Sequence, residues 1–227
     1  MLGEKGYFDT RIAFISRSGP RGRQRTRLAI MDQDGANARM LTAGNWLTLT
    51  PRFSPVKDQV AFMSYANNRP RVYLFDLNTG RQQILGDFQG ISFAPRFSPD
   101  GRTVLLSVTR NGGSDLYSVD LASGARRQLT ASGAIDTSPC YNPDGSQIVF
   151  NSDRGGSPQL YIMPAGGGNA QRISYGQGTY GDPVWSPRGD LIAFTRIAGG
   201  MFSLGVMLPD GTGERIMTEG FTVESPS

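Results

Sequence analysis

Residues 95–101, Pro-Arg-Phe-Ser-Pro-Asp-Gly, are one copy of an element that recurs along this chain. The copy before it is Pro-Arg-Phe-Ser-Pro at 51–55, and the later copies are Pro-Cys-Tyr-Asn-Pro-Asp-Gly at 139–145 and Pro-Val-Trp-Ser-Pro-Arg-Gly at 183–189. Each copy begins 44 residues after the previous one. A fixed period of this length is typical of repeat architectures, in which every copy forms one supersecondary unit.

Each repeat carries the signals of four short strands, which we call a to d. Strand a contains the Pro-x-aromatic element. Strand b is the apolar run that follows it, such as 148–150, and strand c is a second apolar run, such as 160–163. A Gly turn then leads to strand d, which is short, such as 127–130. Strands rich in β-branched and aromatic residues, joined by Gly or Pro turns, form antiparallel sheets. Four strands in about 44 residues predict an all-β fold, a β-propeller of four-stranded blades.

The chain begins out of phase with its repeat. Residues 12–47 supply strands b, c and d of a first blade but no strand a, whereas the end of the chain resembles a lone strand a. We therefore expect one domain, residues 1–227, with five blades, the first of them completed by the C-terminal strand. The repeat units are 12–47, 48–91, 92–135, 136–179 and 180–220, with a closing strand at 221–227.

Composition excludes several classes of function. The 227 residues include no histidine, which excludes Ser-His-Asp and Cys-His catalysis and histidine-ligated metals. The single cysteine, Cys140, permits no internal disulfide. No apolar run reaches the length of a membrane span, and the first residues lack the apolar core of a signal peptide. The net charge of +4 permits acidic partners without indicating nucleic acid.

The aromatic residue of each Pro-x-aromatic element has a predicted structural role. A blade cannot bury its own faces, so neighbouring blades must stack on one another. We expect the four aromatic residues to pack between blades: Phe53, Phe97, Tyr141 and Trp185.

The connections between strands divide into two faces of the propeller. Antiparallel strands reverse direction, so the tight a–b and c–d turns share one face, and the more variable b–c and d–a loops share the other. Variable loops suit recognition. Trp46, Phe93 and Tyr180 lie in or near d–a loops and are candidate interface anchors. The alternative is that they plug the channel or pack under the loops.

Three acidic residues lie near the start of a strands: Asp136, Asp182 and Glu224. They could form a ring that holds Ca²⁺ together with backbone carbonyl groups. We favour the alternative, in which they accept hydrogen bonds from loop amides, because the chain has no contiguous Ca²⁺-loop motif. The prediction is therefore no resident metal or cofactor, with Ca²⁺ as the one open alternative.

The first b–c loop is basic, with five arginines between Arg17 and Arg27. Single-stranded nucleic-acid sites combine such charge with aromatic residues that stack on bases, and this loop has none. We expect a solvated loop that steers an acidic protein partner, and no binding to nucleic acid.

The repeat element and the segment 4–14, Glu-Lys-Gly-Tyr-Phe-Asp-Thr-Arg-Ile-Ala-Phe, resemble the C-terminal propeller of the TolB family of the Tol–Pal system. The resemblance covers almost the whole chain. It implies a non-catalytic periplasmic domain that binds the lipoprotein Pal through the d–a loops around the channel. Carried over by position, it implicates Ile91, Ser92, Phe93, Ile135, Asp136, Thr137, Thr179, Tyr180 and Gly181. Trp46, Asp182 and Glu224 are further candidate partner-binding residues, chosen from their places near the d–a loops and strand starts.

Two departures from the family keep alternatives open. TolB propellers have six blades and follow an N-terminal domain, and we expect five blades and no such domain here. One alternative is an engineered or excised scaffold without a natural ligand. Another is the gating propeller of a prolyl-oligopeptidase-like hydrolase, although the chain has no Gly-x-Ser-x-Gly nucleophile motif. An open ring would expose apolar blade faces and self-associate.

Overall fold

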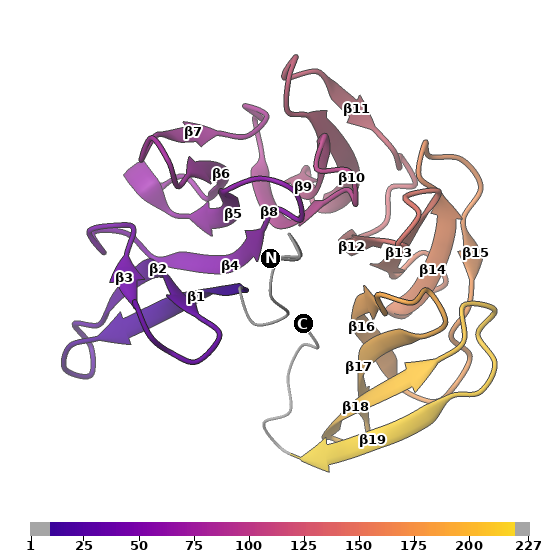
Figure 1. Ribbon diagram of the computed structural model, residues 1–227. Coiled ribbons are helices and arrows are strands. Elements are labelled where there is room, and N and C mark those ends of the chain that lie inside the picture. The colour runs from indigo at the N-terminus through magenta and orange to yellow at the C-terminus, as the bar shows by residue number, and fades with distance from the viewer. Residues whose placement is uncertain (1–9, 221–227) are drawn as a thin grey trace, which may run out of the picture.

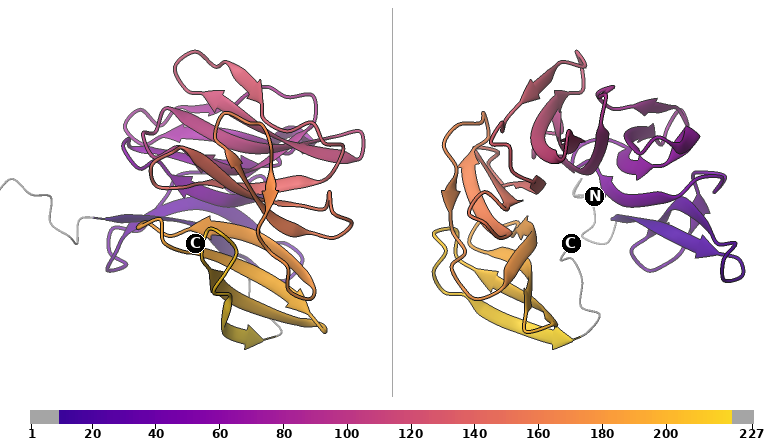
Figure 2. Two further views of the ribbon diagram at one scale, coloured as in Figure 1. Left: turned by 90° about the vertical axis from the view of Figure 1, so that its right-hand side faces the viewer. Right: turned by 180° about the vertical axis from the view of Figure 1, so that it is seen from behind.

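The computed structural model describes residues 10–220, which form five antiparallel β-sheets around a common centre (Figures 1 and 2). The first sheet has three strands and each of the other four sheets has four. The predicted all-β propeller with five blades, the first lacking its strand a, is therefore confirmed. The closing strand expected at 221–227 lies outside the described residues.

The strands follow one another through the blades in chain order. Blade 1 contains β1 (Arg11–Ser18), β2 (Arg25–Asp32) and β3 (Arg39–Met40). Blade 2 contains β4 (Thr48–Phe53), β5 (Gln59–Ser64), β6 (Arg71–Asp76) and β7 (Gln82–Ile84). Blade 3 contains β8 (Ile91–Phe97), β9 (Thr103–Arg110), β10 (Gly113–Asp120) and β11 (Arg126–Gln128).

The last two blades repeat this order. Blade 4 contains β12 (Asp136–Tyr141), β13 (Gln147–Ser152), β14 (Gln159–Pro164) and β15 (Gln171–Arg172). Blade 5 contains β16 (Thr179–Trp185), β17 (Ile192–Ala198), β18 (Met201–Met207) and β19 (Arg215–Gly220). A single short 3-10 turn, η1 (Ala66–Asn68), is the only helical segment between residues 10 and 220, and no helix there has the length and apolarity to span a membrane.

The hydrophobic core lies between blades. Four clusters of buried residues occur, one at each junction of consecutive blades. The cluster between blades 3 and 4, for example, joins Leu105 and Leu116 to Ile148 and Phe150. Phe53, Phe97, Tyr141 and Trp185 pack in or against these four clusters, which confirms their predicted role.

Pairs of aromatic rings strengthen two of these junctions. Phe62 of β5 lies opposite Tyr73 of β6, with ring centroids 5.8 Å apart. Phe150 of β13 lies opposite Tyr161 of β14, with centroids 5.9 Å apart. Because the repeat is 44 residues long, the equivalent pairs in blades 3 and 5 are positions 106 with 117 and 194 with 205.

In blades 3 and 5 one member of the pair is not aromatic. Leu106 occupies the first position of blade 3, and Phe88 from the preceding d–a loop packs on Tyr117 at 5.0 Å. In blade 5 a glycine at position 205 lies opposite Phe194, and Tyr180 packs on that ring at 5.2 Å. An aromatic residue from the start of strand a or from the loop before it thus supplies the missing ring.

Carboxylates stabilise the tight turns on the face that carries the a–b and c–d turns. In the c–d turn of blade 3, the Asp120 carboxylate accepts hydrogen bonds from the Ser123 amide and hydroxyl, both at 2.7 Å, and from the Ala122 amide at 3.1 Å. These bonds, the Ser123 hydroxyl first, lower the pKa of Asp120 below its ordinary value of 3.8. Asp76 makes the equivalent bonds to Thr79 in blade 2, and its pKa is also lowered.

A lowered pKa in the folded state makes these turns sensitive to acid. The stabilisation from Asp120 is complete above its unfolded-state pKa near 3.8 and is lost as the pH falls through its lower folded-state pKa. We expect Ser123→Ala to raise the pKa of Asp120 toward 3.8. The free energy of unfolding of this variant should therefore decrease less than that of the wild type between pH 5 and pH 2. An NMR titration and thermal unfolding at each pH would measure both effects. A wild-type Asp120 that titrates at 3.8 or above would contradict this explanation.

Candidate functional site

The d–a loops lead into β4, β8, β12 and β16, the strands nearest the centre of the ring (Figure 1). Positions 47, 91, 135 and 179 are equivalent in the 44-residue repeat, and each lies at the start of one of these strands or directly before it. Three of these residues are aliphatic and exposed: Leu47 at 41%, Ile91 at 42% and Ile135 at 45%. Thr179, the fourth, is half-buried. We call Leu47, Ile91 and Ile135 the aliphatic rim.

The next position in each repeat is buried in all four blades. Its residues are Thr48, Ser92, Asp136 and Tyr180. The Ser92 hydroxyl accepts a hydrogen bond from the Val72 amide at 3.0 Å, and the Thr48 amide donates to the Thr26 hydroxyl at 2.9 Å. Each of these bonds joins the strand start to the neighbouring blade, so this position anchors the rim.

Asp136 carries the strongest of these anchors. Its carboxylate is fully buried and accepts two hydrogen bonds from Arg154 Nη2, both at 2.9 Å, and one from the Ser132 hydroxyl at 3.0 Å. The Arg154 guanidinium also lies over the rings of Phe150 and Tyr161, about 5 Å from each centroid. Asp136 therefore holds the b–c loop of blade 4 against the start of β12 and is not available as a surface contact.

Tyr180 is likewise part of the core. Its ring is buried in the cluster between blades 4 and 5, and its hydroxyl donates to the Glu214 carboxylate at 2.9 Å. Burial, followed by the Glu214 carboxylate, raises the pKa of Tyr180 to about 12. Of the two alternatives left open for Tyr180, the structure agrees with packing under the loops, because its ring replaces the aromatic residue that blade 5 lacks at position 205.

Each inner strand contains a β-bulge just after this anchor. The register of the a–b pairing shifts at the same place in all four strands. One residue in each bulge has a positive φ without being glycine: Thr50, Ala94, Ser138 and Asp182, with φ between 46° and 53°. A left-handed residue of this kind costs of order 1 kcal/mol and turns the backbone, and four equivalent examples indicate a constraint of the propeller itself.

The other predicted site residues divide between exposed and half-buried positions. Trp46 is 42% exposed and precedes Leu47 in the first d–a loop. Phe93, Thr137 and Gly181 are half-buried on β8, β12 and β16.

The predicted acidic ring does not assemble within the described residues. Asp136 is bound by Arg154, and Asp182 accepts a hydrogen bond from the Ser138 hydroxyl at 2.9 Å. Glu224 lies outside the described residues. Between residues 10 and 220 no group of three acidic or cysteine residues is placed to hold a metal ion. The donors in these bonds are side chains of Arg154 and Ser138, whereas the alternative expected loop amides.

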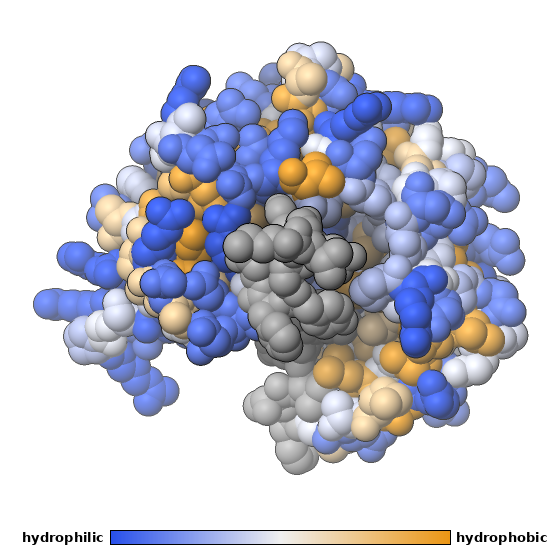
Figure 3. All heavy atoms as spheres, viewed as in Figure 1, coloured by the Kyte–Doolittle hydropathy of each residue, from blue (hydrophilic) through white to orange (hydrophobic). Residues whose placement is uncertain are grey.

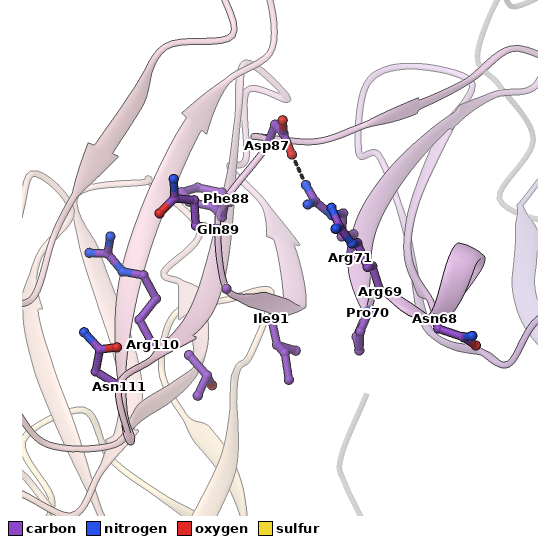
Figure 4. Close-up of a pocket in the computed structure, with 12 residues that line it drawn as sticks. Asn68, Arg69, Pro70, Arg71, Asp87, Phe88, Gln89, Ile91, Arg110 and Asn111 are labelled. Atoms are coloured by element: carbon purple, nitrogen blue, oxygen red, sulfur yellow. Dashed lines mark hydrogen bonds and ion pairs between the residues drawn. The ribbon is translucent and has the colours of Figure 1, made fainter.

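A cavity of about 920 Å³ opens between blades 2 and 3 beside the rim. Figure 4 shows Arg69 and Arg71 on one side of it and Arg110 on the other, with Ile91 between them. Arg71 forms an ion pair with Asp87, the one acidic residue among those that line the cavity. The cavity thus combines positive charge with an exposed aliphatic side chain, which suits an acidic and partly apolar partner segment.

A second cavity of about 410 Å³ lies between blades 4 and 5. Thr179, Gly181 and Asp182 contribute to its lining, together with Ile197 and Phe202. Four of the predicted site residues therefore line one cavity: Thr179, Tyr180, Gly181 and Asp182.

Figure 3 shows a viewed face that is mainly hydrophilic, with hydrophobic residues at several points beside the centre of the ring.

Comparison with known proteins identifies the family. The model of the TolB beta propeller domain matches residues 1–227. The chain belongs to this family. Its structure superposes on TolB from Acinetobacter baumannii with a TM-score of 0.85 and 32% identity, covering 99% of this chain and 57% of that one.

Other relatives define how far the family likeness extends. The sequence is 83% identical to the Tol-Pal system protein TolB of Gluconobacter oxydans over 86 residues. These residues are 38% of this chain and 19% of that protein. The chain thus spans only part of the length of its TolB relatives. A puromycin hydrolase shares the fold, with a TM-score of 0.68 at 17% identity, and covers 88% of this chain and 34% of that one.

One rim residue of this TolB propeller was missed by the sequence prediction. Leu47 occupies the same place in the repeat as Ile91 and Ile135, and the three are almost equally exposed. The 44-residue register was sufficient to find it, because the prediction already included the two equivalent residues. The aromatic residue next to it, Trp46, was selected instead on residue type.

Proposed function

We propose that this propeller is a non-catalytic periplasmic domain that binds the lipoprotein Pal with the face formed by its b–c and d–a loops. The observation that carries the proposal is the aliphatic rim. Leu47, Ile91 and Ile135 are exposed at one repeat position on three neighbouring blades. Exposed aliphatic residues placed in register around the centre of the ring mark a surface for protein contact.

Charge supports this face, and family membership supports a role in the Tol-Pal system. Arg69, Arg71 and Arg110 surround the cavity beside Ile91, so an acidic segment of a partner would be attracted to it. The TolB relatives are named as proteins of the Tol-Pal system. The absence of histidine from all 227 residues gives no support to a hydrolase mechanism of the Ser-His-Asp type.

Substitution of one rim residue tests this proposal. We expect Ile91→Glu to weaken binding of the soluble domain of Pal at least tenfold, because it removes an apolar contact and buries a carboxylate at the interface. Isothermal titration calorimetry would measure the dissociation constants of wild type and variant.

The matched control lies on the opposite face. Val56 is 57% exposed in the a–b turn of blade 2, and Val56→Glu introduces the same charge there. We expect Val56→Glu to bind Pal as wild type does. Equal affinity of the wild type and Ile91→Glu would overturn the proposed face, as would an equal loss of affinity in both variants.

A further inference from the structure

A largely buried cation and an exposed anion meet at the edge of the cavity between blades 2 and 3. Arg71 is the first residue of β6, and its side chain is 15% exposed. Asp87 lies in the d–a loop before β8, and its side chain is 79% exposed. The two form an ion pair, which Figure 4 draws as a dashed line. The cation is therefore held by the sheet, whereas the anion lies on the solvent side of the pair.

This ion pair borders two cavities. Arg69, Arg71 and Asp87 line both the cavity of about 920 Å³ and a smaller cavity of about 360 Å³. The larger cavity is also lined by Ile91 of the aliphatic rim and by Arg110. A partner side chain that enters the larger cavity beside Ile91 can thus reach the Arg71 guanidinium.

The d–a loop is held by contacts that do not involve the Asp87 carboxylate. The carbonyl oxygen of Asp87 accepts a hydrogen bond from Arg126 Nη1 at 2.6 Å, and the Leu85 amide donates to the carbonyl oxygen of Val72 at 2.8 Å. The ring of Phe88 is buried in the cluster between blades 2 and 3. The carboxylate can therefore leave Arg71 while the main chain of the loop stays in place.

The equivalent position of blade 1 carries an arginine without a loop carboxylate. Arg27 lies 44 residues before Arg71, and Ala43 lies 44 residues before Asp87. The Nε atom of Arg27 is buried and has no hydrogen-bond partner among residues 10–220. Arginine thus occurs at this position whether or not the loop supplies an anion. The carboxylate of Asp87 fills a place that an external carboxylate can take.

We propose that a carboxylate of an acidic and aliphatic partner segment displaces Asp87 and binds Arg71, while the neighbouring aliphatic side chain of that segment contacts Ile91. This inference rests on the proposed contact of the loop face with a protein partner. The exchange keeps the guanidinium paired, because one carboxylate replaces another on it and Asp87 moves into solvent. The partner's carboxylate is desolvated beside a cation that is already largely buried, which offsets the cost of its burial.

Substitutions at the ion pair test this exchange by isothermal titration calorimetry with the soluble domain of Pal. We expect Asp87→Asn to bind about threefold more tightly than the wild type, because it removes the competing anion, and Arg71→Gln to bind about tenfold more weakly. The control variants Asp100→Asn and Arg102→Gln alter an exposed ion pair in the a–b turn of blade 3 and should bind as the wild type does. Equal or weaker binding by Asp87→Asn would overturn the proposal.

The double variant Arg71→Gln/Asp87→Asn separates displacement from a general effect of charge. Displacement predicts that it binds as weakly as Arg71→Gln, because Asp87 then has no cation to release. A general repulsion between the partner and an acidic loop predicts instead that Asp87→Asn tightens binding equally in both backgrounds, and this result would contradict the exchange. If Arg71→Gln does not fold, Arg71→Lys takes its place; it lacks the paired N–H donors and should bind about threefold more weakly. Binding by Arg71→Lys as tight as that of the wild type would also contradict the exchange.

An acidic peptide distinguishes failure of this inference from failure of Pal binding. The probe is acetyl-Leu-Glu-Glu-Leu-amide, its uncharged control is acetyl-Leu-Gln-Gln-Leu-amide, and the readout is the NMR signal of the Arg71 Nε–H group. We expect the acidic peptide to shift this signal and the control peptide to leave it unchanged. Such a shift in a chain that does not bind Pal supports the exchange and rejects Pal as the partner. Pal binding that is insensitive to both Arg71→Gln and Asp87→Asn rejects the exchange and leaves the proposed face standing, and the absence of both Pal binding and a peptide shift rejects both proposals.

Discussion

Truncation of Tyr180 to alanine should lower the free energy of unfolding by about 3 to 5 kcal/mol. The ring is fully buried between blades 4 and 5, where it packs on Phe194 at 5.2 Å. Its removal leaves a cavity that the glycine at position 205 cannot fill, because that residue has no side chain. Urea unfolding of the variant and of the wild type measures the difference.

A second tyrosine, in the loop just before β16, provides the control. Tyr175 is 69% exposed, and Tyr175→Ala should change the free energy of unfolding by less than about 1 kcal/mol. Tyr180→Phe keeps the ring and loses only the hydrogen bond to Glu214, so it should cost about 1 kcal/mol. If Tyr180→Ala were as stable as Tyr175→Ala, the core role assigned to Tyr180 would be wrong.

Removal of the Asp136 carboxylate should be almost as costly. We expect Asp136→Ala to lower the free energy of unfolding by about 3 kcal/mol, because it leaves the Arg154 guanidinium partly buried without its anion. The double variant Asp136→Leu/Arg154→Met should recover much of the loss, since it removes both charges and fills the space with apolar atoms. Urea unfolding of the two variants tests both expectations.

An exposed ion pair separates the effect of burial from the effect of pairing. Asp190 and Arg188 are joined at 3.3 Å on the surface of the a–b turn of blade 5. Asp190→Ala should change stability little, because solvent screens both this pair and the exposed hydrogen bond that Asp190 accepts from the Ser186 hydroxyl. A similar loss of stability in Asp136→Ala and Asp190→Ala would show that burial does not strengthen the inner pair.

The architecture of this chain was predictable because its repeat is regular. Four copies of Pro-x-aromatic at a spacing of 44 residues determine the strand order, the number of blades and the inter-blade position of the aromatic residues. The same register locates the β-bulge and the aliphatic rim. These features repeat because every blade meets its neighbours in the same way.

Exposure at individual positions was not predictable from residue type. Trp46 and Tyr180 both looked like aromatic anchors, yet one is exposed and the other is core. The two residues occupy different places in the repeat: Trp46 precedes the rim position, whereas Tyr180 lies at the buried position after it and packs on Phe194. Asp136 likewise looked like a surface carboxylate until Arg154, 18 residues later, was seen to cover it.

The measurement that tests the central claim most directly is amide hydrogen exchange of the chain with and without the soluble domain of Pal. Binding by the loop face predicts new protection in the d–a loops and strand starts at 45–48, 88–93 and 133–137, with unchanged exchange in the a–b turns at 98–102 and 142–146. Protection confined to those turns, or no protection at saturating Pal, would contradict the account.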